Sequence, residues 1–589
     1  MARKRIKGYD AIKPKSFKGF EEFFSELRMA AKMHFLILIV CVLGLFGFVV
    51  TYFLSKWWDD IYLDAFLELK YAISHFHFWT AMGLIKSIFL SFLVVKYPWV
   101  VGGILTGFMW AGLVYFFHRK ARKISSPEHL QGAQIVDPKS FKRGIKEKGK
   151  IKIGSLVIPA SLETRHFLLF GKPGTGKTTI LNQVISSLKK NDKSIIYDFK
   201  GDFIERFYDP KKDHIFNPLD RRSIKWNIFN EIFHRSDITS ISHSLIPPQL
   251  RTQDPYWNNA ARDVFSSILH YLYLNDKKTN RDIWEACTAE PEAIKKMCSY
   301  SEHTKRGLRY IEDASSRHAL SVLSTMHQFV NAFEYMIQMD GDFSISKWIE
   351  EGEGKIFISS YPDIKDLLRP ILSMFIDILS RKLLSLQDSL NRRIYIFLDE
   401  FGSLQFLPSI VDLLTRGRSK GASVWIGIQD LGQISRVYGE NYRQSILNSC
   451  GNAFIFSVSD PTTAKYLVQR IGQRKILEPE ESYSMGVEDF RDGLSISKRV
   501  KIENLLLDSD FYTLPDLTAY VQFAGIDGIT RMKFPYISYL PRNPRMVMVT
   551  ENILEEQKKR IQRQKEKERE IKKEMIKQKE KEQEHELIR

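Results

Sequence analysis

Residues 171–178 of the 589-residue chain read Gly171-Lys172-Pro173-Gly174-Thr175-Gly176-Lys177-Thr178, and Thr179 comes next. The run follows the apolar segment 166–170, which is typical of a buried strand, and it precedes residues 179–188, whose pattern predicts a helix. This is the spacing of a phosphate-binding loop, in which glycines let backbone N–H groups close around the phosphates. Lys177 brings a positive charge to the same oxygens, and the hydroxyl of Thr178 suits Mg²⁺. A chance match is the alternative, but the strand and helix contexts favour ATP and Mg²⁺ bound by residues 171–179.

A second motif stands 222 residues beyond Lys177. Segment 393–398 is apolar on both faces, as in a buried parallel strand, and Asp399 and Glu400 follow it directly. Asp399 can hold Mg²⁺ beside Thr178, and Glu400 can orient and deprotonate a water molecule. Two acids after a strand also occur in solvated turns, but behind a phosphate-binding loop they indicate catalysis. The two motifs predict Mg²⁺-dependent ATP hydrolysis on an α/β, RecA-like, doubly wound sheet, with Lys177 and Glu400 as catalytic residues.

The next segment is a basic turn, residues 415–421, which leads into an apolar strand at 422–428. Gln429 stands at the tip of that strand, where a polar side chain can sense the terminal phosphate. Arg416 and Arg418 are candidates for arginine fingers that reach the nucleotide of a neighbouring subunit. Solvated surface arginines are the other interpretation, and the spacing alone does not decide between them.

Together these motifs resemble the coupling proteins of type IV secretion and conjugation systems, of the TraD-like kind within the RecA/FtsK-like P-loop ATPases. The resemblance covers most of the chain, through the membrane segments described below, the phosphate-binding loop and the stretches 197–202, 214–220, 254–257, 398–401 and 417–421. It implies that Arg418 is the trans-acting finger, that Gln429 is the sensor glutamine, and that a homo-hexameric ring drives single-stranded DNA through its channel. It also implies relaxase or relaxosome proteins and type IV secretion channel proteins as partners. No chemical step is assigned to Asp198 or Lys200.

Two uncharged stretches, 35–55 and 97–117, contain 21 residues each and predict membrane spans. Residues 1–32 carry nine Lys and Arg, and four more follow the second span at once, so both termini are expected to be cytoplasmic. Stretch 76–95 is also apolar apart from Lys86. A third span would place the ATPase outside the cell, so we interpret this stretch as an interfacial or periplasmic helix within the loop 56–96. The prediction is a multi-pass protein of the bacterial inner membrane.

The formal charge of +18 is concentrated beside the membrane. Residues 1–123 hold 17 basic and 8 acidic residues, and the tail 555–589 holds 13 and 10, which leaves +6 for residues 124–554. This distribution favours attachment to an anionic membrane surface over DNA binding. The four cysteines show no metal-binding spacing, which argues against zinc and a disulfide framework.

Between the two nucleotide motifs the pattern changes from strands to helices, over about 236–336, which predicts an all-α domain inserted into the motor domain. The predicted boundaries are 1–32 for a basic N-terminus, 33–118 for the membrane domain, 119–150 for a linker, 151–235 and 337–548 for the two parts of the nucleotide-binding domain, 236–336 for the all-α domain and 549–589 for a charged helical or disordered tail.

The sequence thus predicts an inner-membrane ATPase that recruits a relaxase–DNA complex and drives single-stranded DNA into a type IV secretion channel. An alternative is a membrane-anchored ATPase receptor that delivers protein effectors without translocating DNA. Residues 236–336 do not decide between these two cargoes. A double-strand translocase would carry more membrane spans and a DNA-reading terminus, and this sequence predicts neither.

Overall fold

The computed structural model describes residues 128–145, 147, 149–249, 255–360, 362–484 and 493–549, together with short helical stretches between 35 and 115. Both predicted membrane spans lie wholly or partly outside the described residues, and so does the charged tail. Among the described residues, none of the helices combines the length and the apolar character that crossing a bilayer requires.

The chain forms two compact units, one of residues 1–130 with 476–501 and one of residues 131–475 with 502–589. The first unit holds most of a three-stranded sheet with the order β1-β11-β12. Its strands are β1 (Glu128–Gly132), β11 (Gln473–Ser484) and β12 (Gly493–Asn504).

The second unit is built on a nine-stranded sheet with the order β14-β13-β10-β4-β9-β8-β5-β7-β6. From β10 to β6 neighbouring strands are parallel, and β13 and β14 add an antiparallel edge. The strands are β4 (Phe167–Phe170), β5 (Lys193–Asp198), β6 (His214–Phe216), β7 (Lys355–Ser359), β8 (Ile394–Leu398), β9 (Ala422–Ile428), β10 (Asn452–Ile455), β13 (Thr518–Gln522) and β14 (Thr530–Lys533). Strands β4, β8 and β9 are buried along their whole length, and their residues are apolar apart from Ser423 of β9, because helices cover both faces of a parallel sheet.

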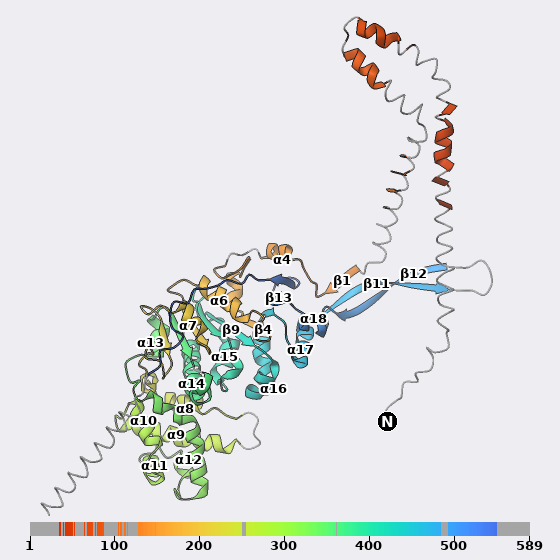
Figure 1. Ribbon diagram of the computed structural model, residues 1–589. Helices are drawn as coiled ribbons and strands as arrows, with labels where there is room; N and C mark the ends of the chain where they lie inside the picture. Colours follow the sequence, from red (N-terminus) through yellow and green to blue (C-terminus); the bar gives the residue numbers. More distant parts are fainter. Residues whose placement is uncertain are drawn as a thin grey trace, which may run out of the picture. The chain divides into compact units, whose positions relative to one another are not determined.

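The two faces of the sheet belong to two separate hydrophobic cores. Leu168 and Phe170 enter one core, and their neighbours Phe167 and Leu169 enter the other, as the alternation of side chains along a strand requires. The first core is closed by α14 (Lys365–Leu384), α15 (Pro408–Arg416), α16 (Leu431–Ser449) and α17 (Pro461–Ile471), and the second by α6 (Lys177–Ser187) and α7 (Asp202–Phe207). The predicted doubly wound α/β sheet is therefore confirmed (Figure 1).

Between β6 and β7 the described residues contain helices and no strand. They are α8 (Arg235–Leu245), α9 (Tyr256–Leu274), α10 (Asn280–Cys287), α11 (Pro291–Cys298), α12 (Arg317–Val330) and α13 (Ile345–Glu351). Shorter elements complete the second unit: β2 (Lys152–Ile153), β3 (Leu156–Val157), α4 (Pro138–Gly144), α5 (Ala160–Glu163) and α18 (Asp508–Tyr512).

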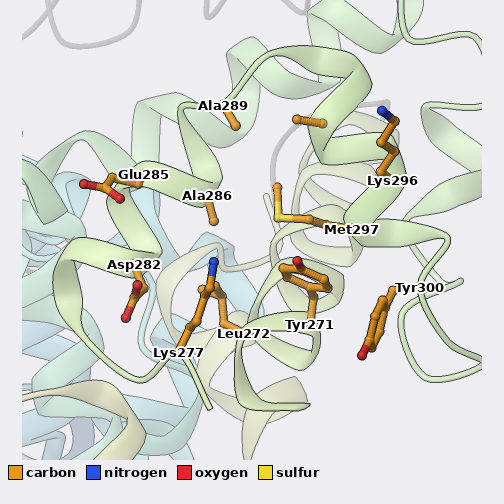
Figure 2. Close-up of a pocket in the computed structure, with 11 residues that line it drawn as sticks. Tyr271, Leu272, Lys277, Asp282, Glu285, Ala286, Ala289, Lys296, Met297 and Tyr300 are labelled. Carbon is orange, nitrogen blue, oxygen red and sulfur yellow. The ribbon is translucent and has the colours of Figure 1, made fainter. Parts of the chain in front are cut away.

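A hollow of about 440 Å³ opens among α9, α10 and α11. Figure 2 shows its lining, which mixes apolar side chains such as Met297 with charged ones such as Lys277 and Asp282. None of the residues predicted for nucleotide chemistry lines this hollow.

Residues 535–549 form an extended segment along the surface of the second unit, which we call the C-terminal strap. Arg545 makes ion pairs with Asp202 at 3.0 Å and with Glu205 at 3.2 Å, both on α7. At its far end Val549 N–H donates to the carbonyl oxygen of Leu219 at 3.0 Å. The strap therefore ties residues 545–549 to α7 and to the loop that follows β6.

Candidate nucleotide-binding site

The phosphate-binding loop lies between the end of β4 and the start of α6, which begins at Lys177. Gly174 and Gly176 have φ angles of +83° and +125°, a conformation that side chains with a Cβ rarely adopt. The Lys177 ammonium is buried and donates hydrogen bonds to the carbonyl oxygens of Gly171 and Lys172. The loop thus encloses one positive charge at the N-terminus of a helix, which is an environment suited to an anion.

Thr178 and Asp399 meet across the site. The Thr178 hydroxyl lies 3.3 Å from Oδ1 and 3.2 Å from Oδ2 of Asp399, although 221 residues separate them in sequence. Burial raises the pKa of the Asp399 carboxyl, and the charge of Lys177 opposes that shift. Carboxylate and hydroxyl oxygens are ligands that Mg²⁺ prefers, so this pair fits the metal.

Glu400 and Gln429 also lie together. The Gln429 side-chain amide donates a hydrogen bond to Oε2 of Glu400. This contact follows from the order of the sheet, in which β9 runs between β4 and β8, so that Gln429 and Glu400 follow neighbouring strands at the same edge. Burial raises the pKa of the Glu400 carboxyl, and a raised pKa suits the base near neutral pH that the sequence predicts.

The two candidate arginines lie at the other end of the strands, where β9 begins. Arg418 belongs to the loop 417–421 that precedes β9, whereas Gln429 follows that seven-residue strand, so roughly 20 Å separate them along the strand. The Arg416 guanidinium pairs with Asp412 on its own helix at 3.0 Å. Arg418 is exposed, and within the described part of the chain its guanidinium has no hydrogen-bond or ion-pair partner.

Sequence reasoning gave no role to the segment after β5, which the structure places beside the site. Tyr197 pairs in register with Leu398, so Asp198 lies level with Asp399 on the neighbouring strand. The Asp198 carboxylate accepts hydrogen bonds from the first turn of α7, and burial raises its pKa to about 7. Lys200 is exposed, and its charge acts on the carboxylates of both Asp399 and Glu400. An acid and a lysine at the end of a buried strand were the signal available in the sequence.

Comparison with known proteins agrees with this geometry. Residues 150–535 match the family described as "Type IV secretion-system coupling protein DNA-binding domain". The coupling protein TraD of Escherichia coli (strain K12) is 31% identical over 451 residues, which are 73% of this chain and 62% of TraD. The type IV secretion system-coupling protein VirD4 of Bartonella henselae is 24% identical over 252 residues, 39% of this chain and 38% of VirD4. The chain thus matches less than two thirds of the length of these curated relatives.

Solved structures of a plasmid coupling protein, TrwB, share the fold. The structure in complex with ADP and Mg²⁺ superposes with a TM-score of 0.63 at 28% identity, covering 71% of this chain and 97% of TrwB. The complex with a non-hydrolysable ATP analogue gives 0.63 at 27% identity, covering 72% and 99%. The family match extends over well more than half of the sequence and includes every residue of the site, so the chain belongs to the type IV secretion-system coupling proteins.

Proposed function

We propose that this chain is a Mg²⁺-dependent ATPase. The observation that carries the proposal is the meeting of Lys177, the Thr178–Asp399 pair and the Glu400–Gln429 pair at one edge of the sheet. In support, relatives of similar fold have been solved with ADP and Mg²⁺ and with an ATP analogue.

Each residue has a separate task in this proposal. Lys177 exchanges the carbonyl oxygens that it now binds for phosphate oxygens, and Thr178 and Asp399 hold the metal. Glu400 accepts a proton from the attacking water, while Gln429 fixes the orientation of that carboxylate. Bound Mg²⁺ would neutralise charge that develops on the phosphates.

Arg418 cannot take part in its own site, because a whole strand separates the two. We assign it to the site of a neighbouring copy, as an arginine finger that stabilises charge in the transition state. A contact between the finger edge of one copy and the nucleotide edge of the next is heterologous, and such contacts close into rings when the rotation allows. A homo-hexamer is the assembly proposed here.

The work of this motor is proposed to be the transfer of single-stranded DNA into a type IV secretion channel at the bacterial inner membrane. The family description names a DNA-binding domain, and TrwB is a bacterial conjugative coupling protein. Recruitment of a relaxase, the spans at 35–55 and 97–117 and the domain boundaries predicted above are parts of the same proposal.

The test is ATP turnover by the full-length chain with single-stranded DNA, with double-stranded DNA and without nucleic acid. We expect strong stimulation by single strands, and a loss of about a hundredfold or more in Lys177→Ala, which removes charge stabilisation at the phosphates. ATP turnover that is the same with and without DNA would favour the alternative function, which is delivery of protein effectors. Absence of turnover under every condition would contradict the proposal itself.

A further inference from the structure

Two surface loops meet at the edge of the sheet where β8 and β9 begin. The finger loop, residues 417–421, carries Arg418 and joins α15 to β9. The other loop, residues 385–393, joins α14 to β8, and we call it the brace loop. Parallel neighbouring strands bring these loops together, although nothing in their local sequences predicts it.

The brace loop contacts the finger loop through the side chain of Asp388. One oxygen of its carboxylate, Oδ1, accepts a hydrogen bond from the Ser419 hydroxyl at 3.0 Å and lies 2.7 Å from the Lys420 ammonium. The next residue, Ser389, donates its N–H to the carbonyl oxygen of Ser419 at 2.8 Å. Asp388 thus binds the two residues that directly follow Arg418.

The backbones of the two loops are also in close contact. Ile394 N–H donates to the carbonyl oxygen of Gly421 at 3.0 Å. A Cβ at Gly421, where φ is +84°, would lie 2.3 Å from the carbonyl oxygen of Arg392. The finger loop therefore has a fixed base, and the Asp388 side chain adds to the backbone hydrogen bonds that hold its middle, such as that from Gly421 N–H to the carbonyl oxygen of Arg418 at 3.1 Å.

Stability alone does not account for the Asp388 contact. Its side chain is 69% exposed, against 22% for Lys420, and an ion pair with one member so exposed contributes little to folding. Its geometric effect is greater, because it helps to order the backbone next to an exposed arginine whose guanidinium has no hydrogen-bond or ion-pair partner within the described residues. A guanidinium held in one direction loses less freedom when it binds an anion.

We infer that Asp388 is a positioning residue that aims Arg418 at the nucleotide bound by a second copy of this chain. The inference rests on the proposed role of Arg418 as a finger. The group that Arg418 would contact on the second copy is a bound nucleoside triphosphate. Its negative charge would lie between Lys177 and Asp399 of that copy.

The experiment compares Asp388→Ala with Arg418→Ala in the full-length chain, by steady-state ATP turnover with saturating single-stranded DNA. In Asp388→Ala we expect kcat to fall about ten- to a hundredfold, because small misplacements of a catalytic group have effects of that size. The KM for ATP should stay within about twofold, because the binding residues lie at the other edge of the sheet. In the double variant Asp388→Ala/Arg418→Ala, turnover should equal that of Arg418→Ala alone.

Two further variants make the test specific. Lys420→Ala removes the other member of the same ion pair and should lower kcat in the same way. This variant keeps the test available if Asp388→Ala is too unstable to assay. Asp412→Ala is the matched control, because it breaks an ion pair to Arg416 whose members are 67% and 57% exposed beside the same loop. This control should turn over ATP like the unchanged protein.

The outcomes separate the inference from the proposed function. Normal turnover in Arg418→Ala would overturn both the finger and the role of Asp388. An inactive Arg418→Ala beside a normal Asp388→Ala would overturn only the inference. Equal losses in Asp388→Ala and Asp412→Ala would also overturn it, because the loop would then be sensitive to any lost charge.

Discussion

The titratable residues of the nucleotide site are held in an environment that disfavours their charges. Burial lowers the pKa of Lys177 and raises that of Asp399 and of Glu400, and the opposite charges across the site moderate each shift. Such a site gains more from a bound anion and its metal than a solvated site would. Because Lys177→Ala also removes the charge that offsets those of Asp399 and Glu400, thermal unfolding of that variant is measured beside its ATP turnover.

His166, directly before β4, allows a test of burial at a single residue. Its side chain is 2% exposed, and Nδ1 accepts a hydrogen bond from the backbone N–H of Val424 at 3.1 Å. Burial lowers the pKa of the imidazole to about 4, whereas an unfolded histidine titrates near 6.5. The unfolded chain therefore binds more protons between these values, so stability from this group is complete above about pH 6.5 and is lost as the pH falls.

We predict that His166→Asn reduces the loss of stability between pH 7.5 and pH 5.5. The difference expected from the two pKa values is about 1.4 kcal/mol at pH 5.5. Asparagine is chosen because it tolerates the φ of 50° at this position. Thermal unfolding at the two pH values measures the effect, and the exposed His129→Asn is the control. An unchanged pH dependence in His166→Asn would contradict this account of His166.

At the level of the elements, β9 packs so closely against the end of β8 beside the site that no side chain fits at Gly427. A Cβ at Gly427 on β9 would lie 2.1 Å from the backbone carbonyl oxygen of Asp399. Farther from this end Phe167 of β4 stacks on Trp425 of β9, with ring centroids 3.8 Å apart. The position of Asp399 is therefore set by the absence of a side chain on the neighbouring strand.

Gly427→Ala should consequently displace the end of β8 and separate Asp399 from Thr178. We expect a loss of about 1–3 kcal/mol of stability, as for other overpacked interiors, together with weaker Mg²⁺-dependent ATP binding. Thermal unfolding and nucleotide titration with and without Mg²⁺ measure the two effects. Gly144→Ala is the control, because its new Cβ would meet its nearest neighbour, a side-chain atom of Ile526, at 3.8 Å. If ATP binding by Gly427→Ala depends on Mg²⁺ as in the unchanged protein, the strands have accommodated the new Cβ without moving Asp399, and the prediction is wrong.

The sequence predicted those elements whose signal is local. The buried strands, the loop at 171–178 and the acids after β8 each combine apolar periodicity with a short motif. The order of the sheet, with β9 between β4 and β8, depends on long-range pairing that no local pattern records. The C-terminal strap was missed for a related reason, since its extended backbone is held by scattered polar contacts such as Arg545 with Asp202. The predicted domain boundaries and site roles stay predictions.

At the scale of the whole molecule, the separation of Arg418 from its own site makes activity a property of the assembly. Chains with Lys177→Ala keep an intact finger, and chains with Arg418→Ala keep an intact nucleotide site. We predict that an equal mixture of these two inactive variants regains activity, up to about one quarter of the normal rate if subunits assemble at random in a ring. Turnover should be measured after co-expression and compared with each variant alone. A mixture that stays inactive would contradict action in trans.

Membrane topology is a second prediction at this scale. The charge distribution predicts both termini in the cytoplasm and loop 56–96 in the periplasm. Alkaline phosphatase folds into an active enzyme only outside the cytoplasm, so a fusion after Tyr71 should be active and a fusion after Lys123 inactive. The reverse pattern would contradict the proposed arrangement.

Strand β9 has one further consequence. It is hydrogen-bonded along both sides, to β4 and to β8, with Gln429, the proposed sensor, at one tip and the finger loop with Arg418 at the other. An axial slip of β9 would break the hydrogen-bond ladders on both sides, so the strand keeps Gln429 and the finger loop a fixed distance apart. In the proposed ring, the seven-residue length of β9 would therefore set the separation between the nucleotide site of each copy and the finger that it offers to the next.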